Sequence, residues 1–154
     1  MTREALHAFK FGGRRGLAAP LGDLIAELGL GALPGAAPDL LVPVPLHRRR
    51  ARERGYNQSA LLAMRVARAW GLPVAHDALA RIAPTRPQTE LDAAARRGNV
   101  RGAFAARRPE AVAGRHVLLV DDVFTTGATA AECARCLVGA GAEAVGVLTL
   151  ARAL

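Results

Sequence analysis

The sequence lacks the residues that would make it a disulfide-rich, zinc-binding or membrane-spanning protein. Its two cysteines, Cys133 and Cys136, can neither build a disulfide framework nor fill a tetrahedral zinc site by themselves. No apolar run approaches the roughly 18 residues that a membrane span requires. Residues 1–11 are charged and contain no apolar segment of the kind found in secretory signals. These absences predict a cytoplasmic protein with no membrane insertion.

Lysine and aromatic side chains are also scarce. Lys10 is the only lysine among 21 basic residues, so the net charge of +8 comes almost entirely from arginine. This arginine bias is typical of a GC-rich genome, yet a positive balance still favours anionic partners such as phosphates, nucleotides or nucleic acid. Aromatic residues make up 4% of the chain, too few and too scattered for a base-stacking platform.

The 154 residues, of which 51% are hydrophobic, fit one globular unit. The clearest pattern lies in the last third, with an apolar strand over 117–120, a turn over 121–127, a helix over 128–139 and a strand over 144–150. This βαβ order predicts parallel strands. Periodicity and capping residues predict helices over 2–11, 17–29 and 57–70, and short strands over 40–45 and 79–82.

The residues with the clearest chemistry follow the strand over 117–120. Asp121 and Asp122 come first, at the edge of a parallel sheet where ligands of α/β folds bind. A small, hydroxyl-rich turn with Gly127 then opens a helix, and the backbone N–H groups of a helix N-terminus suit a phosphate. Carboxylates that can bind vicinal hydroxyls near a phosphate site indicate a ribose 5-phosphate. The alternative is an ordinary strand-turn-helix corner with solvated acids.

The segment over 117–129 resembles the phosphoribosyl pyrophosphate (PRPP) motif of type I phosphoribosyltransferases, which has four apolar residues, two acids and a Thr/Gly loop. Other segments are similar to the ComF/GntX competence-protein branch of that family. They are residues 10–14, 42–45, 54–58 and 86–89, with Leu91, Arg96, Asn99 and Phe104. The resemblance implies an α/β fold, with a type I phosphoribosyltransferase-like parallel sheet flanked by helices over 38–154 and a small N-terminal helical hood over 1–37.

The same resemblance implies roles for individual residues. Asp121 and Asp122 would orient the ribose, and the 5′-phosphate would bind at Thr125, Thr126, Gly127, Ala128 and Thr129. The pyrophosphate would bind at Arg48, Arg54, Gly55, Tyr56, Asn57 and Gln58. Mg²⁺ would arrive with PRPP, without a dedicated protein site, and the two acids are its candidate ligands. For the basic segment over 47–54, nucleic-acid binding and a solvated turn stay open as alternatives.

The polar segment over 84–101 matches a flexible loop of these enzymes in position. Its candidates for contact with pyrophosphate are Arg86, Gln88, Arg96 and Asn99, and the alternative is an ordinary mobile loop. Cys133 and Cys136 share one face of the predicted helix over 128–139 and are expected to be small buried residues. Members of the branch commonly begin with a four-cysteine zinc module, and this chain resembles them from the helix after that module onward.

The resemblance implies a PRPP-binding protein of the ComF type that is linked to DNA uptake and natural transformation, with Mg²⁺-pyrophosphate as the leaving group. Single-stranded DNA and proteins of the DNA-uptake machinery are then candidate partners. Two alternatives stay open. One is a phosphoribosyltransferase of nucleotide metabolism with an unidentified acceptor, and the other is a non-catalytic module that binds PRPP or nucleic acid.

Overall fold

The computed structural model describes residues 15–29, 33, 35–83 and 98–152. The helix expected over 2–11 lies outside these ranges. No helix in the described ranges is both long and apolar enough to cross a membrane. The elements follow one another in the order η1 (Arg15–Leu17), α2 (Ala18–Gly29), β1 (Leu40–Pro43), α3 (Arg48–Arg54), α4 (Gln58–Trp70), β2 (Leu79–Arg81), β3 (Phe104–Ala106), α6 (Pro109–Val112), β4 (His116–Phe124), α7 (Ala128–Gly139) and β5 (Ala144–Arg152).

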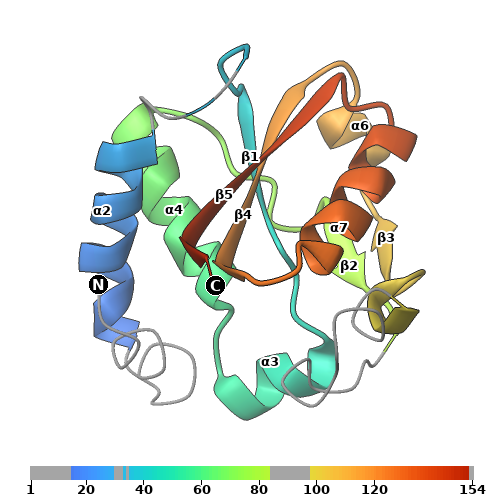
Figure 1. Cartoon of the computed structure of the whole chain (residues 1–154), viewed down its shortest axis with the longest axis horizontal. Helices are drawn as coiled ribbons and strands as arrows, with labels where there is room; N and C mark the ends of the chain where they lie inside the picture. Colours follow the sequence, from blue (N-terminus) through green and yellow to red (C-terminus); the bar gives the residue numbers. More distant parts are fainter. Residues whose placement is uncertain (1–14, 30–32, 34, 84–97, 153–154) are drawn as a thin grey trace.

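The main sheet has three parallel strands in the order β1-β4-β5, so β4 lies in the centre (Figure 1). Val117 of β4 pairs with Leu40 of β1 on one side and with Val145 of β5 on the other. The parallel pairing predicted from the βαβ order is therefore confirmed. Because parallel strands run in one direction, the carboxyl ends of β1 and β4 meet at the same edge of the sheet.

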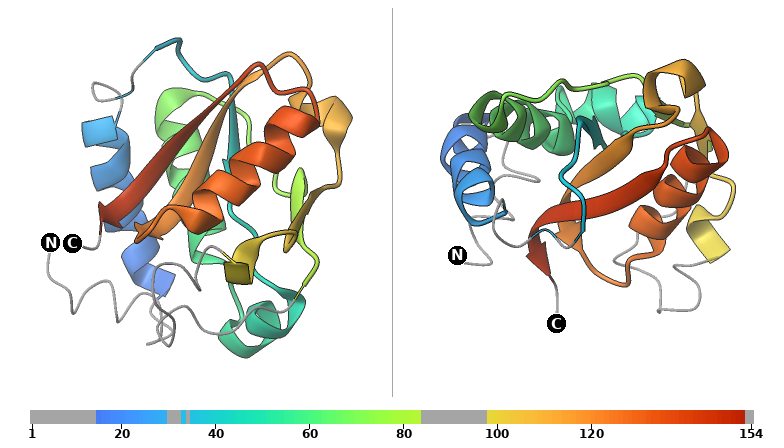
Figure 2. Two further views of the ribbon diagram at one scale, coloured as in Figure 1. Left: turned by 45° about the vertical axis from the view of Figure 1, so that its right-hand side comes forward. Right: turned by 90° about the horizontal axis from the view of Figure 1, so that it is seen from above.

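Side chains of β4 alternate between two hydrophobic cores, one on each face of the sheet. Leu118 and Val120 pack against α2 and α4 through Leu21, Ile25, Leu62 and Val66. Val117 and Leu119 pack on the opposite face with Cys133 and Leu137 of α7. Figures 1 and 2 show this division, with α2 and α4 together on one side of the strands and α7 on the other. The sheet is thus flanked by helices, as the sequence predicts.

Helix α2 falls in the segment expected as an N-terminal hood, and it packs directly on α4. Arg65 of α4 forms an ion pair with Asp23 of α2, with 2.7 Å between Nη2 and Oδ2. A Cβ on Gly22 would lie only 2.5 Å from Cβ of Arg65, so the two helices approach closely at this glycine. Helix α2 therefore shares a core with the sheet, and the domain boundary at residue 37 stays a prediction.

A second, smaller sheet joins β2 and β3 in an antiparallel pair. Leu79 pairs with Ala106, and Arg81 pairs with Phe104. The strand expected over 79–82 is confirmed in position, whereas β3 was not predicted because its three residues carry no distinctive pattern. Phe104 is buried in the same core as α7, which fixes this small sheet beside the main one.

Two local predictions need correction. Strand β4 continues to Phe124, so the acid pair lies within the strand and not in the turn, because β5 runs alongside and pairs Phe124 with Arg152. Residues 48–54 form the helix α3 and not a turn, although none of these residues is buried. His47 caps this helix, and the left-handed Gly55, with a φ of 72°, ends it.

Candidate functional site

A cavity of about 420 Å³ lies at the carboxyl ends of β1 and β4. The walls come from the residues after β1, from α3, from the start of α4, from β2, from the end of β4 and from the start of α7. The residues that line it are Val44, Pro45, Leu46, Arg50, Glu53, Arg54, Gln58, Ser59, Arg81, Asp121, Asp122, Val123, Phe124, Thr125, Gly127, Thr129 and Ala130. This is the edge of the sheet where open α/β folds bind ligands.

Both acids of the predicted pair border this cavity. Asp122 is buried, with 8% of its surface exposed, and Asp121 is half-buried. Oδ1 of Asp121 accepts two hydrogen bonds, one of 3.0 Å from the hydroxyl of Ser59 and one of 2.8 Å from the N–H of Asp122. The first acid is therefore held in place from both α4 and its own strand.

The turn from β4 to α7 forms the next part of the wall. Gly127 precedes α7 in a left-handed conformation with a φ of 77°, and a Cβ there would lie 2.6 Å from Cζ of Phe124. Glycine is required on both counts. Thr125, Gly127 and Thr129 line the cavity, beside the helix N-terminus that favours an anion. Thr126 and Ala128 do not line it, and Oγ1 of Thr126 accepts the N–H of Ala128 at 3.4 Å.

Helix α3 supplies basic side chains to the cavity. Arg50 and Arg54 are four residues apart, on one face of the helix, and both line the cavity. Nη1 of Arg54 donates to Oε1 of the buried Gln58 at 3.3 Å. Burial lowers the pKa of Arg54, an effect that Asp122 opposes and Arg50 reinforces. Arg48, the other arginine expected to bind pyrophosphate, is exposed and lies outside the lining.

The residues between α3 and α4 have structural contacts instead of a place in the cavity lining. Gly55 ends α3, and its N–H donates to the carbonyl of Ala51. Tyr56 packs at the edge of the α2–α4 core, with the guanidinium of Arg15 5.1 Å from its ring centroid. Asn57 caps α4 by accepting the N–H of Ser59 at 3.0 Å, and its Nδ2 donates to the carbonyl of Val44 at 3.0 Å. Asn57 thereby fixes the start of α4, whose first residues line the cavity, relative to the segment after β1.

Sequence reasoning missed several residues that the fold brings to the cavity. Arg50 was not distinguished from its neighbours, although its spacing from Arg54 places both on one helical face. Ser59 and Phe124 adjoin residues that were singled out. Arg81 reaches the cavity from β2, with its guanidinium 5.3 Å from the ring centroid of Phe104. No local signal marks it, because its direction depends on how β2 pairs with β3.

Three of the four residues expected in the loop over 84–101, namely Arg86, Gln88 and Arg96, lie outside the described residues. Asn99, the fourth, is described; it is half-buried and lies outside the cavity lining. The structure neither joins the three to the site nor separates them from it.

The sequence predicts that both cysteines are buried. This prediction holds for Cys133, whereas Cys136 is only half-buried. Cys133 is fully buried, and burial raises the pKa of its thiol. Cys136 is half-buried, and its thiol donates to the carbonyl of Phe104 at 3.3 Å. Within the described ranges, no group of three or more His, Cys, Asp or Glu side chains is arranged to hold a metal ion.

A three-stranded parallel sheet with an acid pair at the end of its central strand, followed by a glycine turn into a helix, defines a phosphoribosyltransferase-type protein. The chain belongs to the phosphoribosyl transferase domain family, whose model matches residues 56–154, and to its ComF competence-type branch. The family expected from the sequence motifs is thereby confirmed.

Curated relatives support this branch. The chain is 40% identical over 152 residues to the DNA utilization protein YhgH of Escherichia coli K12. This alignment covers 97% of this chain and 66% of that protein. It is 39% identical over 117 residues to competence protein F of Haemophilus influenzae, in an alignment that covers 75% of this chain and 51% of that protein. It is 32% identical over 156 residues to competence protein ComFC of Bacillus subtilis, with coverage of 99% and 60%. The chain thus spans about half to two thirds of the length of these relatives.

Solved structures show the same fold at low identity. The glutamine PRPP amidotransferase of Bacillus subtilis, complexed with ADP and GMP, is similar with a TM-score of 0.62 and 22% identity over 94% of this chain and 30% of that one. The adenine phosphoribosyltransferase of Thermoanaerobacter pseudethanolicus is similar with a TM-score of 0.51 and 16% identity over 85% of this chain and 79% of that one. The expected type I phosphoribosyltransferase-like fold is therefore confirmed.

Proposed function

We propose that this protein binds PRPP with Mg²⁺ and transfers its phosphoribosyl group to an acceptor, as a ComF-type protein with a role in the uptake or use of DNA. One observation carries the proposal. A single cavity is lined by two carboxylates, a helix-initiating glycine turn and the arginines of α3. These three features match the vicinal hydroxyls, the 5′-phosphate and the pyrophosphate of PRPP, respectively.

Each part of PRPP has a suitable partner in the cavity. The 5′-phosphate binds at the turn, where Thr125, Gly127 and Thr129 border the N-terminus of α7. The ribose hydroxyls donate to the carboxylates of Asp121 and Asp122. The pyrophosphate binds at the α3 side, where the planar fork of an arginine matches phosphate oxygens in pairs.

The described residues fit Mg²⁺ only in the form that substrate-bound magnesium takes. Mg²⁺ commonly uses one or two carboxylates together with substrate phosphates and waters. Asp121 and Asp122 supply such carboxylates at the cavity wall, and the described part of the chain has no larger acidic or His/Cys cluster for a dedicated site. When bound, the ion neutralises charge on the departing pyrophosphate.

The proposed reaction is a displacement at the anomeric carbon of the ribose. The acceptor forms a bond to that carbon and gives up a proton to solvent, while the bond to the pyrophosphate oxygen breaks and pyrophosphate leaves with the electron pair. Positive charge develops on the ribose ring in the transition state. Asp121 and Asp122 orient the ring and stabilise that charge, and the arginines stabilise the leaving group.

Calorimetric titration of PRPP with Mg²⁺ tests the site directly. We expect the wild type to bind and the double variant Asp121→Asn/Asp122→Asn to lose binding about a hundredfold or more, since two charged contacts disappear. Asp77→Asn is the matched control, because Asp77 is an exposed carboxylate paired with Arg108 away from the cavity. A folded wild type that does not bind PRPP would contradict the proposal.

Pyrophosphate release separates transfer from simple binding. Incubation with PRPP, Mg²⁺ and a panel of acceptors, including nucleobases and amines, should release pyrophosphate with at least one of them. Binding without release in the whole panel favours a module that binds PRPP without catalysis.

A second candidate function, binding of single-stranded DNA, is favoured by the outer face of α3 and by the names of the relatives. Arg48 and Arg52 are exposed on this helix, on the side away from Arg50 and Arg54. We expect Arg48→Glu/Arg52→Glu to weaken DNA binding and to reduce its salt dependence, because phosphate contacts release counterions. Arg107→Glu, on an exposed residue beyond β3, is the control. Affinity that does not change with salt would contradict this candidate.

A further inference from the structure

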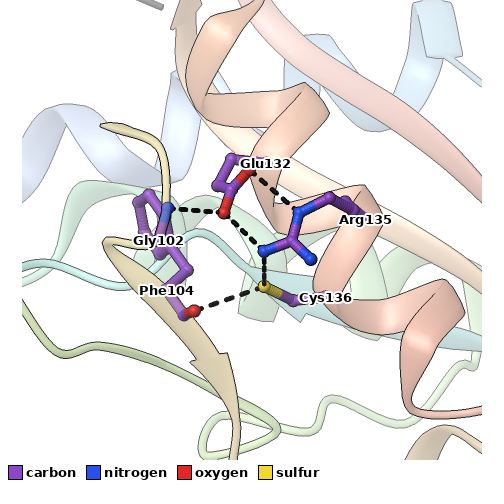
Figure 3. A network of polar contacts seen from close by, with 5 residues as sticks. All are labelled: Gly102, Phe104, Glu132, Arg135 and Cys136. Carbon is purple, nitrogen blue, oxygen red and sulfur yellow. Dashed lines mark hydrogen bonds and ion pairs between the residues drawn. The ribbon is translucent and has the colours of Figure 1, made fainter. Parts of the chain in front are cut away.

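A network of polar contacts behind the cavity fastens β3 to α7 (Figure 3). Oε1 of Glu132 accepts the N–H of Gly102 at 2.8 Å, two residues before β3 begins. The thiol of Cys136 donates to the carbonyl of Phe104 at 3.3 Å. Arg135 holds both oxygens of the Glu132 carboxylate, with 3.1 Å from Nε to Oε2 and 2.7 Å from Nη2 to Oε1. The start of β3 is therefore tied to the middle of α7.

Glu132 is one of two buried acids in the described part of the chain, with 8% of its surface exposed, and the other is Asp122 in the cavity wall. The pKa of Glu132 is lowered, mainly by the hydrogen bond from Arg135 and further by the N–H of Gly102, although burial opposes this effect. The carboxylate thus stays charged, and a charged acceptor makes a stronger hydrogen bond to the Gly102 N–H than a neutral one. Glu132 therefore contacts the segment that leads into β3 through a charge-assisted hydrogen bond.

Strand β3 in turn positions Arg81 of the neighbouring strand β2. Arg81 of β2 pairs with Phe104 of β3, and its guanidinium lies 5.3 Å from the centroid of the Phe104 ring. The ring is buried, with 3% of the residue exposed, in the core that includes Cys133 and Leu137 of α7. The guanidinium of Arg81 therefore lies against a ring whose position depends on α7. Arg81 also lines the cavity.

The charges around the cavity indicate what Arg81 binds. Burial lowers the pKa of Arg81, Arg50 lowers it further, and Asp121 raises it. Arg50 also lowers the pKa of Arg54. Arg50 thus disfavours the charges of both Arg54 and Arg81 at one cavity, and a multiply charged anion placed among the three guanidinium groups relieves this repulsion.

We propose that Arg81 is a further pyrophosphate-binding residue and that Glu132 is the positioning residue that holds it at the cavity through Gly102 and Phe104. This inference rests on the proposed PRPP site. Helix α7 borders the cavity with Thr129 and holds β3 with Glu132, so one helix sets the spacing between the 5′-phosphate turn and Arg81. Arg81 then acts on the pyrophosphate end of PRPP and not on the ribose 5-phosphate end.

Calorimetric titration with Mg²⁺ and three ligands, namely PRPP, inorganic pyrophosphate and ribose 5-phosphate, tests the role of Arg81. We expect Arg81→Ala to weaken binding of PRPP and pyrophosphate about tenfold or more, through the loss of a charge-assisted contact, and to change ribose 5-phosphate binding less than about twofold. Arg107→Ala is the matched control, because Arg107 adjoins the same small sheet but is exposed and outside the cavity lining.

The positioning role of Glu132 has its own signature. We expect Glu132→Ala to weaken pyrophosphate binding about threefold to tenfold, and Glu132→Gln, which keeps an acceptor for Gly102, to restore most of it. In the Arg81→Ala background, Glu132→Ala should have no further effect, because the two residues act in series. Glu143→Gln, on an exposed residue, is the control. A general structural defect would instead weaken ribose 5-phosphate binding and add to the effect of Arg81→Ala.

Two outcomes overturn the inference while PRPP binding by the wild type still supports the proposed function. The first is an Arg81→Ala variant that binds pyrophosphate as tightly as the wild type. The second is a Glu132→Ala effect that persists in the Arg81→Ala background. A folded wild type that binds neither PRPP nor pyrophosphate overturns the proposed function and this inference together.

Discussion

The hydroxyl of Ser59 donates a hydrogen bond of 3.0 Å to Oδ1 of Asp121, and this bond joins the first turn of α4 to the end of β4. Ser59 is 4% exposed, so water cannot easily take its place. The same carboxylate oxygen accepts the N–H of Asp122 at 2.8 Å. Asp121 is thus oriented before any ligand binds, which reduces the entropic cost of binding.

Removal of this hydroxyl should weaken the site without dismantling it. We expect Ser59→Ala to cost about 1 kcal/mol of PRPP binding, roughly fivefold in affinity, because one hydrogen bond to a carboxylate is lost. Calorimetric titration measures the affinity, and urea unfolding shows whether the variant is folded. A folded variant with wild-type affinity would show that the bond does not orient Asp121 for binding.

Asn57 should matter for stability more than for affinity. Asn57→Ala removes the cap of α4 and the bond to the carbonyl of Val44, and we expect it to lower the free energy of unfolding by about 1–2 kcal/mol. His47→Ala removes the longer cap bond of 3.4 Å on the exposed α3 and should cost less. Urea unfolding compares the two. A large loss of PRPP affinity with unchanged stability would instead assign Asn57 to the pyrophosphate site.

Gly127 should tolerate no side chain. Gly127→Ala places a Cβ 2.6 Å from Phe124 in a backbone conformation with a φ of 77°, so we expect a loss of about 2–4 kcal/mol of stability and of PRPP binding. Gly114→Ala is the matched control, since Gly114 has a φ of 69° but open space around it. It should cost only about 1 kcal/mol. Equal losses in the two variants would show that the contact with Phe124 is unimportant.

The Glu132 contact should make stability depend on pH in acid. Because the folded state lowers the pKa of Glu132, its contribution is complete above the unfolded value of about 4.3 and is lost as pH falls through the lower folded value. We expect the wild type to be more stable than Glu132→Gln at pH 7 and this difference to shrink below about pH 4. Urea unfolding between pH 7 and pH 3 measures it. A difference that is constant over this range would show that the charge of Glu132 contributes nothing.

Local signals account for the elements that the sequence predicted well. The short apolar run from Val117 to Val120, followed by a small, hydroxyl-rich turn, favours a buried strand, and Asn57 and Gly71 lie at the two ends of α4 as its caps. Gly127 marks the turn into α7 because no other residue fits there. Each of these features depends on the chemistry of a few consecutive residues, which a single sequence displays.

The remaining parts of the site depend on contacts between distant segments. Whether Arg48 or Arg50 faces the cavity is decided by how α3 sits below β1, and both residues are arginines in an unbroken basic run. Arg81 points inward only because β2 pairs with β3, and that strand has three residues with no pattern of its own. The extension of β4 past the acid pair likewise depends on its pairing with β5.

The central position of β4 also affects how the protein is made. Asp39, which precedes β1, is separated by 77 positions from His116, the first residue of β4, yet the N–H of each bonds to an oxygen of the other. On the ribosome, β1 therefore emerges long before β4. Until β4 has been synthesised, the backbone groups of Leu40–Pro43 lack the strand that they pair with. Such long-range pairing slows folding and leaves apolar segments exposed to aggregation. The yield of this protein should accordingly respond to chaperones and to growth temperature more strongly than its final stability does.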